Sequence, residues 1–184
     1  MLKKELEDNG RNIAIVLNSI FQDEKEREKF NKFLNDLLPF ADDLSVDRMR
    51  DESFITCLKE SYTDYYFPAY LLSDGTINIV AMIVILFFEE KSVIILEEPG
   101  RNLHPLLLSK IINMMEDVSQ ELNKQIIITT HNPEIIRYTD PKKIIVINRD
   151  EDGFSQMSKP FEKVELKTFL KDIGMADLFL EGIL

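Results

Sequence analysis

The stretch Val93-Ile94-Ile95-Leu96-Glu97-Glu98-Pro99 decides the fold class of this chain. A short apolar run, mostly β-branched, is followed at once by two carboxylates and a proline. Two further runs have the same character: QIIITT at 125–130 and KIIVIN at 143–148. Continuous runs of this kind are typical of strands buried on both faces of a parallel sheet. A helical pattern over 105–122 separates the first two runs, so the sequence predicts an α/β fold with a mostly parallel sheet.

The part of the chain before these strands has mostly helical periodicity. Apolar residues recur every three or four positions over 12–21 and 24–38. Ser73-Asp74-Gly75-Thr76 is typical of a helix start and precedes an apolar helix that reaches Phe88. The sequence therefore predicts a helical segment before this start, with a short strand near 54–58.

The predicted elements indicate one incomplete domain without an internal repeat or a Pro/Gly-rich linker. We expect a helical segment over 1–71, a core over 72–150 that carries the chemistry, and a tail over 151–184. Within the tail, the pattern predicts helices over 164–170 and 176–180.

Composition limits the classes of function. The chain has 184 residues, 45% of them hydrophobic, which is typical of a protein with a packed core. Its net charge of −11 weighs against broad nucleic-acid binding, which depends on Lys and Arg. A single cysteine, Cys57, excludes a disulfide framework. The longest apolar run, 77–88, is shorter than the roughly 20 residues that span a bilayer, and no secretory signal precedes it, so we expect a cytoplasmic protein without a membrane segment.

Three polar clusters lie at strand ends or helix starts, where open α/β sheets bind ligands. Ser73 and Gly75 open a helix whose free N–H groups suit an anion, although a simple N-cap is the plainer interpretation. Glu97 and Glu98 end the first strand and suit Mg²⁺ and an attacking water, or they simply end a strand in solvent. His131 ends the second strand and suits a ligand that carries charge, or it is a structural histidine at a corner.

The order of these clusters resembles the heads of ABC-type ATPases. LSDGT at 72–76 is similar to their signature motif, and VIILEEP at 93–99 is similar to the Walker B strand with its catalytic glutamate. GRNLHP at 100–105 resembles the D-loop, and IIITTHNP at 126–133 resembles the switch-histidine loop. The motifs are closest to those of predicted AAA-type ATPases related to the OLD, RecF and SMC-like heads, and the strong match covers 72–138.

The resemblance implies ATP and Mg²⁺ as cofactors. Glu98 would be the catalytic base for the attack of water on the γ-phosphate, and His131 would sense that phosphate. Glu97 would lie near the metal ion.

The resemblance also implies a dimer. Ser73 and Gly75 would contact the γ-phosphate of a nucleotide held by another subunit, and Asn102 and Leu103 would lie at the dimer seam. Two sites would form when two heads enclose two ATP molecules.

The phosphate-binding loop of such ATPases, G-x-x-x-x-G-K-[ST], does not occur in this sequence, because none of the six glycines is followed by Lys. We therefore expect the carboxy-terminal portion of an ATPase head that is inactive alone. Its partner would be a second copy or a chain that supplies the Walker A lobe, with DNA in the full assembly and a role in DNA repair, recombination or defence. Two alternatives fit the same residues: a non-catalytic dimerisation or regulatory module, and a complete small domain in which the motifs are structural turns.

Overall fold

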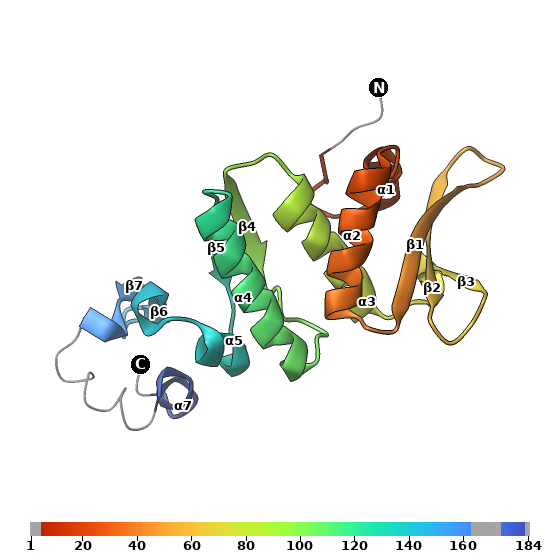
Figure 1. Cartoon of the computed structure of the whole chain (residues 1–184). Coiled ribbons are helices and arrows are strands. Elements are labelled where there is room, and N and C mark those ends of the chain that lie inside the picture. The colour runs from red at the N-terminus through yellow and green to blue at the C-terminus, as the bar shows by residue number, and fades with distance from the viewer. Residues whose placement is uncertain (1–4, 163–173, 183–184) are drawn as a thin grey trace. The chain divides into compact units, whose positions relative to one another are not determined.

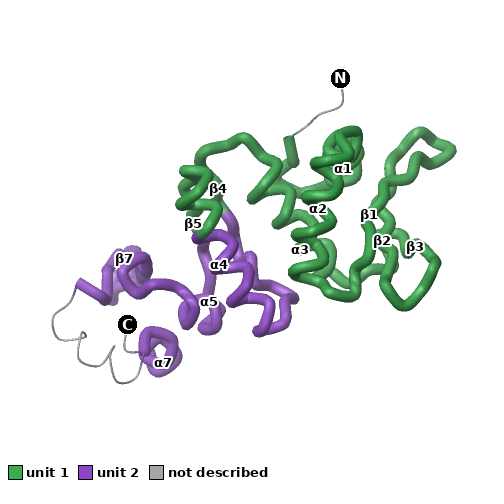
Figure 2. The backbone as a smooth tube through the Cα atoms, in the orientation of Figure 1, with its two compact units in different colours: residues 1–95, 117–127 green, residues 96–116, 128–184 purple. Residues whose placement is uncertain are grey.

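The computed structural model describes residues 5–162 and 174–182 of the chain. The chain divides into two compact units, which Figure 2 colours separately. Unit 1 holds residues 1–95 and 117–127, and unit 2 holds residues 96–116 and 128–184. The fold is α/β, as the sequence predicts, and Figure 1 labels its elements.

Two helices open unit 1. α1 (Ile13–Ile20) and α2 (Glu24–Leu37) lie within one residue of the ranges that the sequence predicts. Asp23 caps α2, because its carboxylate accepts a hydrogen bond from the backbone N–H of Lys25 at 2.9 Å. Asn12 lies before α1 and is buried, and its side-chain oxygen accepts from the N–H of Glu7 at 2.8 Å. The side chain of Asp23 therefore satisfies a free N–H group at the start of α2, whereas the side chain of Asn12 ties down the segment that leads into α1.

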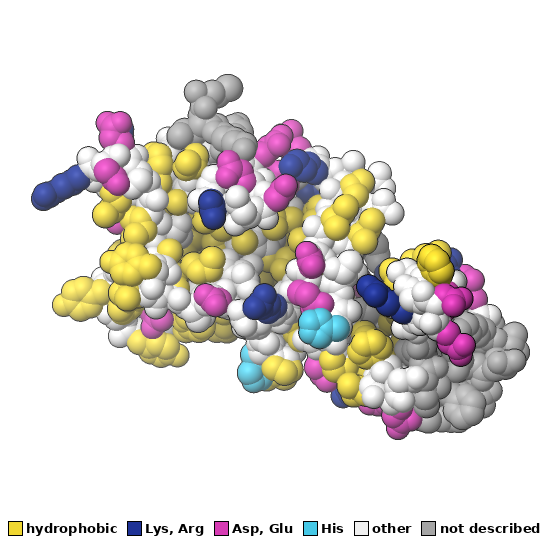
Figure 3. Space-filling view, turned by 180° about the vertical axis from the view of Figure 1, so that it is seen from behind, with side chains coloured by type: hydrophobic (Ala, Val, Ile, Leu, Met, Phe, Trp, Pro, Cys, Tyr) yellow, Lys and Arg dark blue, Asp and Glu magenta, His cyan; other side chains and the backbone are white. Residues whose placement is uncertain are grey.

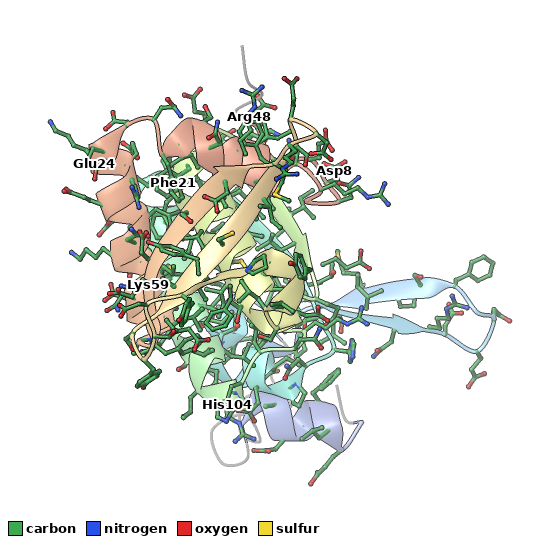
Figure 4. All side chains as sticks on the ribbon, turned by 90° about the vertical axis from the view of Figure 1, so that its right-hand side faces the viewer. Asp8, Phe21, Glu24, Arg48, Lys59 and His104 are labelled. Atoms are coloured by element: carbon green, nitrogen blue, oxygen red, sulfur yellow. The ribbon has the colours of Figure 1, made fainter. Side chains whose placement is uncertain are left out.

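A cluster of aromatic side chains forms the centre of unit 1. Phe21, labelled in Figure 4, packs edge-on against Phe30 of α2, with 5.4 Å between ring centroids. Phe30 also lies 5.8 Å from the ring of Phe88, and its side chain is fully buried. Aliphatic side chains of the helices and of the sheet in the same unit are also fully buried or nearly so: Leu17, Leu34, Leu37, Leu44, Leu58, Ile79 and Ile83.

The sheet of unit 1 is antiparallel and has three strands in the order β1-β2-β3. They are β1 (Ala41–Arg48), β2 (Phe54–Glu60) and β3 (Tyr66–Pro68). α1 and α2 both pack against it (Figure 1). A single turn of 3-10 helix, η1 (Ala69–Leu71), leads from β3 to the signature-like residues.

The sequence did not predict β1. Its residues ADDLSVDR carry three aspartates, and a register shift near its start breaks the alternation of buried and exposed residues. Distant residues compensate for the charge of Asp43: Arg27 of α2 donates to both of its carboxylate oxygens at 3.0 and 2.8 Å. Asn31 donates to the same carboxylate at 2.7 Å, as does the hydroxyl of Tyr66 at 2.8 Å. Tertiary contacts therefore stabilise a strand whose local pattern is weak.

The apolar run before β4 forms one continuous helix, which is α-helical at first and π-helical at its end. α3 (Asp74–Ile83) continues into η2 (Val84–Phe88), a π-helical turn, so the helix ends at the residue that the sequence predicts. The buried amine of Lys124 donates to the carbonyl oxygens of Leu86 at 3.0 Å and Glu89 at 2.5 Å. Burial lowers the pKa of Lys124, and the charge of Glu89 opposes this shift. Lys124 thus supplies donors to carbonyl groups at the end of this helix.

β4 (Val93–Glu97) and β5 (Gln125–Thr129) form the parallel pair that the sequence predicts. The N–H of Gln125 donates to the carbonyl of Ser92 at 2.7 Å, and the N–H of Glu98 donates to that of Thr129 at 2.8 Å. Both strands therefore end at the same edge. α4 (Pro105–Glu121) connects them, as predicted.

The run at 143–148 requires a correction. The sequence places it in the same parallel sheet, whereas β6 (Val146–Arg149) pairs antiparallel with β7 (Ser155–Ser158) in a separate two-stranded sheet. Turn chemistry explains this pairing: the carboxylate of Asp150 accepts from the N–H groups of Asp152 and Phe154, and Gly153 has a φ of 85°. A hairpin therefore forms in place of a crossover.

The remaining elements of unit 2 are short. α5 (Pro133–Tyr138) and α7 (Met175–Leu180) pack together through the buried side chains of Ile136, Met175 and Ala176. Two turns of 3-10 helix, η3 (Pro141–Lys143) and η4 (Pro160–Glu162), flank the hairpin. α7 matches the helix predicted over 176–180, and the helix predicted over 164–170 lies outside the described residues. Within the described part of the chain, no helix combines the length and the apolar character that crossing a bilayer requires.

Candidate functional site

The loops that follow β4 and β5 meet in unit 2. Glu98 follows β4 directly, and its backbone has a φ of 47°, a left-handed conformation that non-glycine residues rarely adopt. The N–H of Glu98 donates to the carbonyl of Thr129 at the end of β5, at 2.8 Å. This bond holds the strained residue beside the loop that begins at Thr130.

The carboxylate of Glu98 accepts three hydrogen bonds from Thr130 and His131, the first two residues after β5. Its Oε1 accepts from the backbone N–H of His131 at 2.9 Å and lies 2.6 Å from the ring Nδ1 of the same residue. Its Oε2 accepts from the hydroxyl of Thr130 at 3.1 Å. The structure thus brings together the two residues to which the sequence assigns catalysis.

Exposure differs sharply between the two partners. The side chain of His131 is 86% exposed, whereas that of Glu98 is 28% exposed. Both histidines of the chain lie at the surface in Figure 3, where they are cyan. The imidazole of His131 is therefore accessible to a ligand, while the carboxylate lies partly behind it.

Two opposing effects determine the charge of Glu98. Partial burial raises the pKa of its carboxyl group, and the hydrogen bonds from the ring of His131, the hydroxyl of Thr130 and the N–H of His131 lower it. The net result is a pKa below the ordinary value of 4.5. Glu98 is therefore ionised at neutral pH, as a base must be.

This lowered pKa predicts a dependence of stability on pH. Because the pKa is depressed in the folded chain, the contribution of Glu98 is fully present above about pH 4.5, the unfolded value, and is lost as the pH falls through the folded value. In magnesium-free buffer, the difference in unfolding free energy between the wild type and Glu98→Gln should change as the pH falls below 4.5. Urea unfolding at each pH measures it, and an equal difference at pH 3 and pH 7 would contradict the expectation.

A pocket of about 650 Å³ opens next to this pair. Its lining comes from the loop after β4 and from the loop that leads from β5 into α5: Glu98, Gly100, Arg101, Asn102, Leu103, His131, Asn132 and Pro133. The sequence assigned Asn102 and Leu103 to a dimer seam, and both line this pocket. Asn102 has a left-handed φ of 62°, so the loop is sharply turned there.

Gly100 allows the two loops to approach each other. The residue is buried, and a Cβ atom at this position would lie 2.8 Å from Cδ1 of Ile135, 3.0 Å from Cδ2 of Leu108 and 3.4 Å from Nδ2 of Asn132. The first two distances are shorter than ordinary carbon contacts. Glycine at this position therefore lets the loop after β4 pack against α4 and the start of α5.

His104 has a structural contact at the start of α4. Its ring Nδ1 accepts a hydrogen bond from the N–H of Leu106 at 3.2 Å. Figure 4 labels this histidine, and it is not among the residues that line the pocket.

Glu97 ends β4, is exposed, and does not line the pocket. The described residues contain no group of three or more His, Cys, Asp or Glu side chains that could hold a metal ion by themselves. Mg²⁺ needs few protein ligands when phosphate oxygens complete its coordination, so one or two carboxylates after β4 fit that ion. They would hold it only together with a nucleotide.

The signature-like residues belong to unit 1. Ser73 is the N-cap of α3: its hydroxyl accepts from the N–H of Thr76 at 3.1 Å and lies 2.9 Å from the hydroxyl of that residue. Gly75 is buried in the first turn. The plain capping interpretation of Ser73 is therefore confirmed, and its contact with a nucleotide remains a prediction.

Replacing the cap gives a measurable effect. Ser73→Ala leaves the N–H of Thr76 without its acceptor and should lower the free energy of unfolding by about 1 kcal/mol, whereas Ser73→Asn should retain most of the stability. Urea unfolding monitored by circular dichroism measures both variants. Equal losses for alanine and asparagine would contradict the capping role.

Sequence reasoning did not assign a role to Thr130 or Arg101. Thr130 precedes the histidine directly, and a hydroxyl next to a candidate site residue is the signal that was available. Arg101 lines the pocket and follows Gly100, within a loop that the sequence had already singled out.

Comparison with known proteins gives relatives of the same kind. A protein of Bacillus cereus (strain ATCC 10987 / NRS 248) described as a "Putative ABC transporter ATP-binding protein" is 29% identical over 92 residues, which is 50% of this chain and 16% of that protein. The match thus spans about a sixth of the length of this relative.

Solved structures show the same fold at low identity. A chain from a structural study of the ATP-driven dimerization and DNA-stimulated activation of SMC ATPases has a TM-score of 0.61 and 15% identity, and the match covers 89% of this chain and 97% of that one. An Smc head domain with a coiled coil and joint from Pyrococcus yayanosii has a TM-score of 0.60 and 15% identity, covering 91% of this chain and 32% of that one. The chain therefore has the fold of an ATPase head.

A family model matches most of the chain. Residues 4–137 match the family described as "AAA domain, putative AbiEii toxin, Type IV TA system". The match includes the loops after β4 and β5 and the signature-like residues. The chain belongs to this family of AAA domains and is an ABC/AAA-type, ATPase-like domain.

Proposed function

We propose that this chain supplies the catalytic-glutamate and signature half of an ATPase head and hydrolyses ATP only with a Walker A lobe. One observation carries the proposal: the ionised Glu98 lies 2.6 Å from the exposed His131, at the edge of a pocket at the ends of two parallel strands. A carboxylate and an imidazole in such a place suit a water molecule and a terminal phosphate. Family membership supports ATP as the ligand.

Each of the two residues has a defined step in this proposal. Glu98 accepts a proton from the water that attacks the γ-phosphorus, while the bond between that phosphorus and the bridging oxygen breaks and ADP leaves. The imidazole of His131 turns from Glu98 to the γ-phosphate and donates a hydrogen bond to it. Glu97 would hold Mg²⁺, directly or through water, and the ion would supply positive charge to the phosphates.

The partner completes the site. The 184 residues contain no loop of the type G-x-x-x-x-G-K-[ST] to surround the phosphates with N–H groups, so this chain alone should not turn over ATP. Another chain would provide that loop, because a second copy of this chain lacks it as well. Ser73 and Gly75 would contact the γ-phosphate in trans, and Asn102 and Leu103 would lie at the seam between the subunits.

The cellular role that we propose is in defence or DNA repair, in the cytoplasm. The family description refers to toxin–antitoxin systems, and the first structural relative comes from work on DNA-stimulated SMC ATPases. The net charge of −11 favours DNA contacts by other parts of the assembly.

The absence of the phosphate-binding loop from this sequence also fits a second function. A non-catalytic dimerisation or regulatory module would bind a complete ATPase without contributing to hydrolysis. It differs from the first function in one respect: the pair of Glu98 and His131 would have no effect on turnover.

Assembly in the presence of nucleotide tests the proposal. The chain is mixed with a homologous amino-terminal lobe that carries the Walker A motif, and sedimentation velocity is recorded with MgATP, with MgADP and without nucleotide. We expect a larger species with MgATP only, because the γ-phosphate joins the two halves. Identical profiles under all three conditions would contradict the proposal.

A further inference from the structure

The hydroxyl of Thr130 connects the two loops of the site. It donates a hydrogen bond to Oε2 of Glu98 at 3.1 Å and accepts one from the backbone N–H of Asn132 at 3.0 Å. A hydroxyl has a single proton and two lone pairs. Because the N–H of Asn132 occupies a lone pair, the proton remains available for the carboxylate.

The two oxygens of Glu98 are held by different groups. Oε1 accepts from the backbone N–H of His131 and from its ring, whereas the contact to Oε2 comes from Thr130. A carboxylate held at one oxygen can still rotate about the bond to its side chain. Contacts at both oxygens fix the plane of the group.

The three contacts differ in how easily they can break. The ring of His131 is 86% exposed and can rotate away from Glu98 toward a ligand. The N–H of His131 belongs to the backbone, and the hydroxyl of Thr130 is itself fixed by the N–H of Asn132. After the ring has left, one donor therefore remains at each oxygen of the carboxylate.

The backbone of Glu98 increases the need for such donors. Its left-handed φ of 47° is a conformation that costs energy for a residue with a side chain. Contacts with the surrounding structure must therefore hold this residue in place.

We propose that Thr130 is a positioning residue, whose hydroxyl keeps the Glu98 carboxylate aimed into the pocket while the ring of His131 moves to its ligand. This inference rests on the proposed ATPase function. It assigns a role to Thr130, to which neither the family match nor the sequence motifs give one. In the Thr-Thr-His sequence this role belongs to Thr130 and not to Thr129.

The first arm of the test uses the full chain without nucleotide. Thr130→Val removes the hydroxyl and keeps the shape, Thr130→Ser restores the hydroxyl, and Thr129→Val is the matched control at the exposed neighbouring threonine. In ¹H–¹⁵N spectra, the amide of His131 reports its bond to Glu98. We expect Thr130→Val to shift this amide in the direction that Glu98→Gln shifts it, and we expect Thr130→Ser and Thr129→Val to leave it near the wild-type position.

The second arm uses the assembly with the Walker A lobe. Thr130→Val should lower kcat about 10- to 100-fold and leave the KM for ATP within about twofold, because the residue aims the base and does not touch the nucleotide. Thr130→Ser should recover kcat to within about threefold of the wild type.

The inference is wrong if Thr130→Val leaves the amide of His131 and kcat unchanged, or if Thr130→Ser is as impaired as Thr130→Val. The two arms separate it from the proposed function. If the wild-type assembly shows no turnover, the proposed function fails, and the amide of His131 still decides whether Thr130 positions Glu98.

Discussion

Replacement of Glu98 by glutamine should lower the rate of phosphate release by the assembled ATPase about 1,000-fold. A general base contributes roughly 100- to 10,000-fold, and glutamine has nearly the same shape but cannot accept the proton of water. The amide oxygen can replace Oε1 and keep the bond from the N–H of His131, while the amide NH2 replaces Oε2 and can donate to the hydroxyl of Thr130, so the pocket should keep its form. ATP should therefore bind and remain unhydrolysed. A coupled phosphate assay and the ratio of ATP to ADP in the isolated complex measure both effects.

The matched control for this variant is Glu90→Gln, which makes the same change at an exposed carboxylate outside the pocket. It should leave turnover within about twofold of the wild type, as surface substitutions usually do. Turnover by Glu98→Gln equal to that of the control would support the non-catalytic alternative, because the base would then have no role.

Removal of the ring of Phe30 should have the largest effect on stability. Phe30 is fully buried, touches the rings of Phe21 and Phe88, and lies on the inner face of α2. Phe30→Ala leaves a cavity and should lower the free energy of unfolding by about 3–5 kcal/mol. Urea unfolding followed by circular dichroism measures the loss. Phe88 is the last residue of the helix that Ser73 caps. The same change should therefore also loosen the carboxy-terminal end of that helix.

An exposed position on the same helix provides the comparison. Lys32→Ala should change the unfolding free energy by less than about 0.5 kcal/mol, since the residue faces solvent. If Phe30→Ala were as stable as Lys32→Ala, the packing described for unit 1 would be wrong.

The parallel pair and its two loops could be predicted because their signals are local. A β-branched run followed by charge identifies β4, a second run identifies β5, and the helical spacing between them identifies α4. Two parallel strands that are joined by a helix place their carboxyl ends at one edge of the sheet, so Glu98 and His131 could be expected at the same edge.

The antiparallel elements could not be predicted in the same way. β1 is stabilised by the contacts of Asp43 with Arg27, Asn31 and Tyr66, which are far away in sequence. β6 resembles a strand of a parallel sheet in its residues, and the turn at Asp150 decides its partner.

Within the site, the types of residue were predictable and their contacts were not. The motif order identified Glu98 and His131, but the left-handed backbone of Glu98 and the bond to Thr130 depend on how two loops pack around Gly100. The capping role of Ser73 was predictable, since serine before a helix is a common signal.

The rate of phosphate release from MgATP, measured for this chain, for the Walker A lobe and for their mixture, tests the central claim most directly. The account predicts background rates for each half and sustained turnover in the mixture, rising with the concentration of this chain until the two are equimolar. Turnover by this chain alone, or a mixture no faster than the lobe by itself, would contradict it.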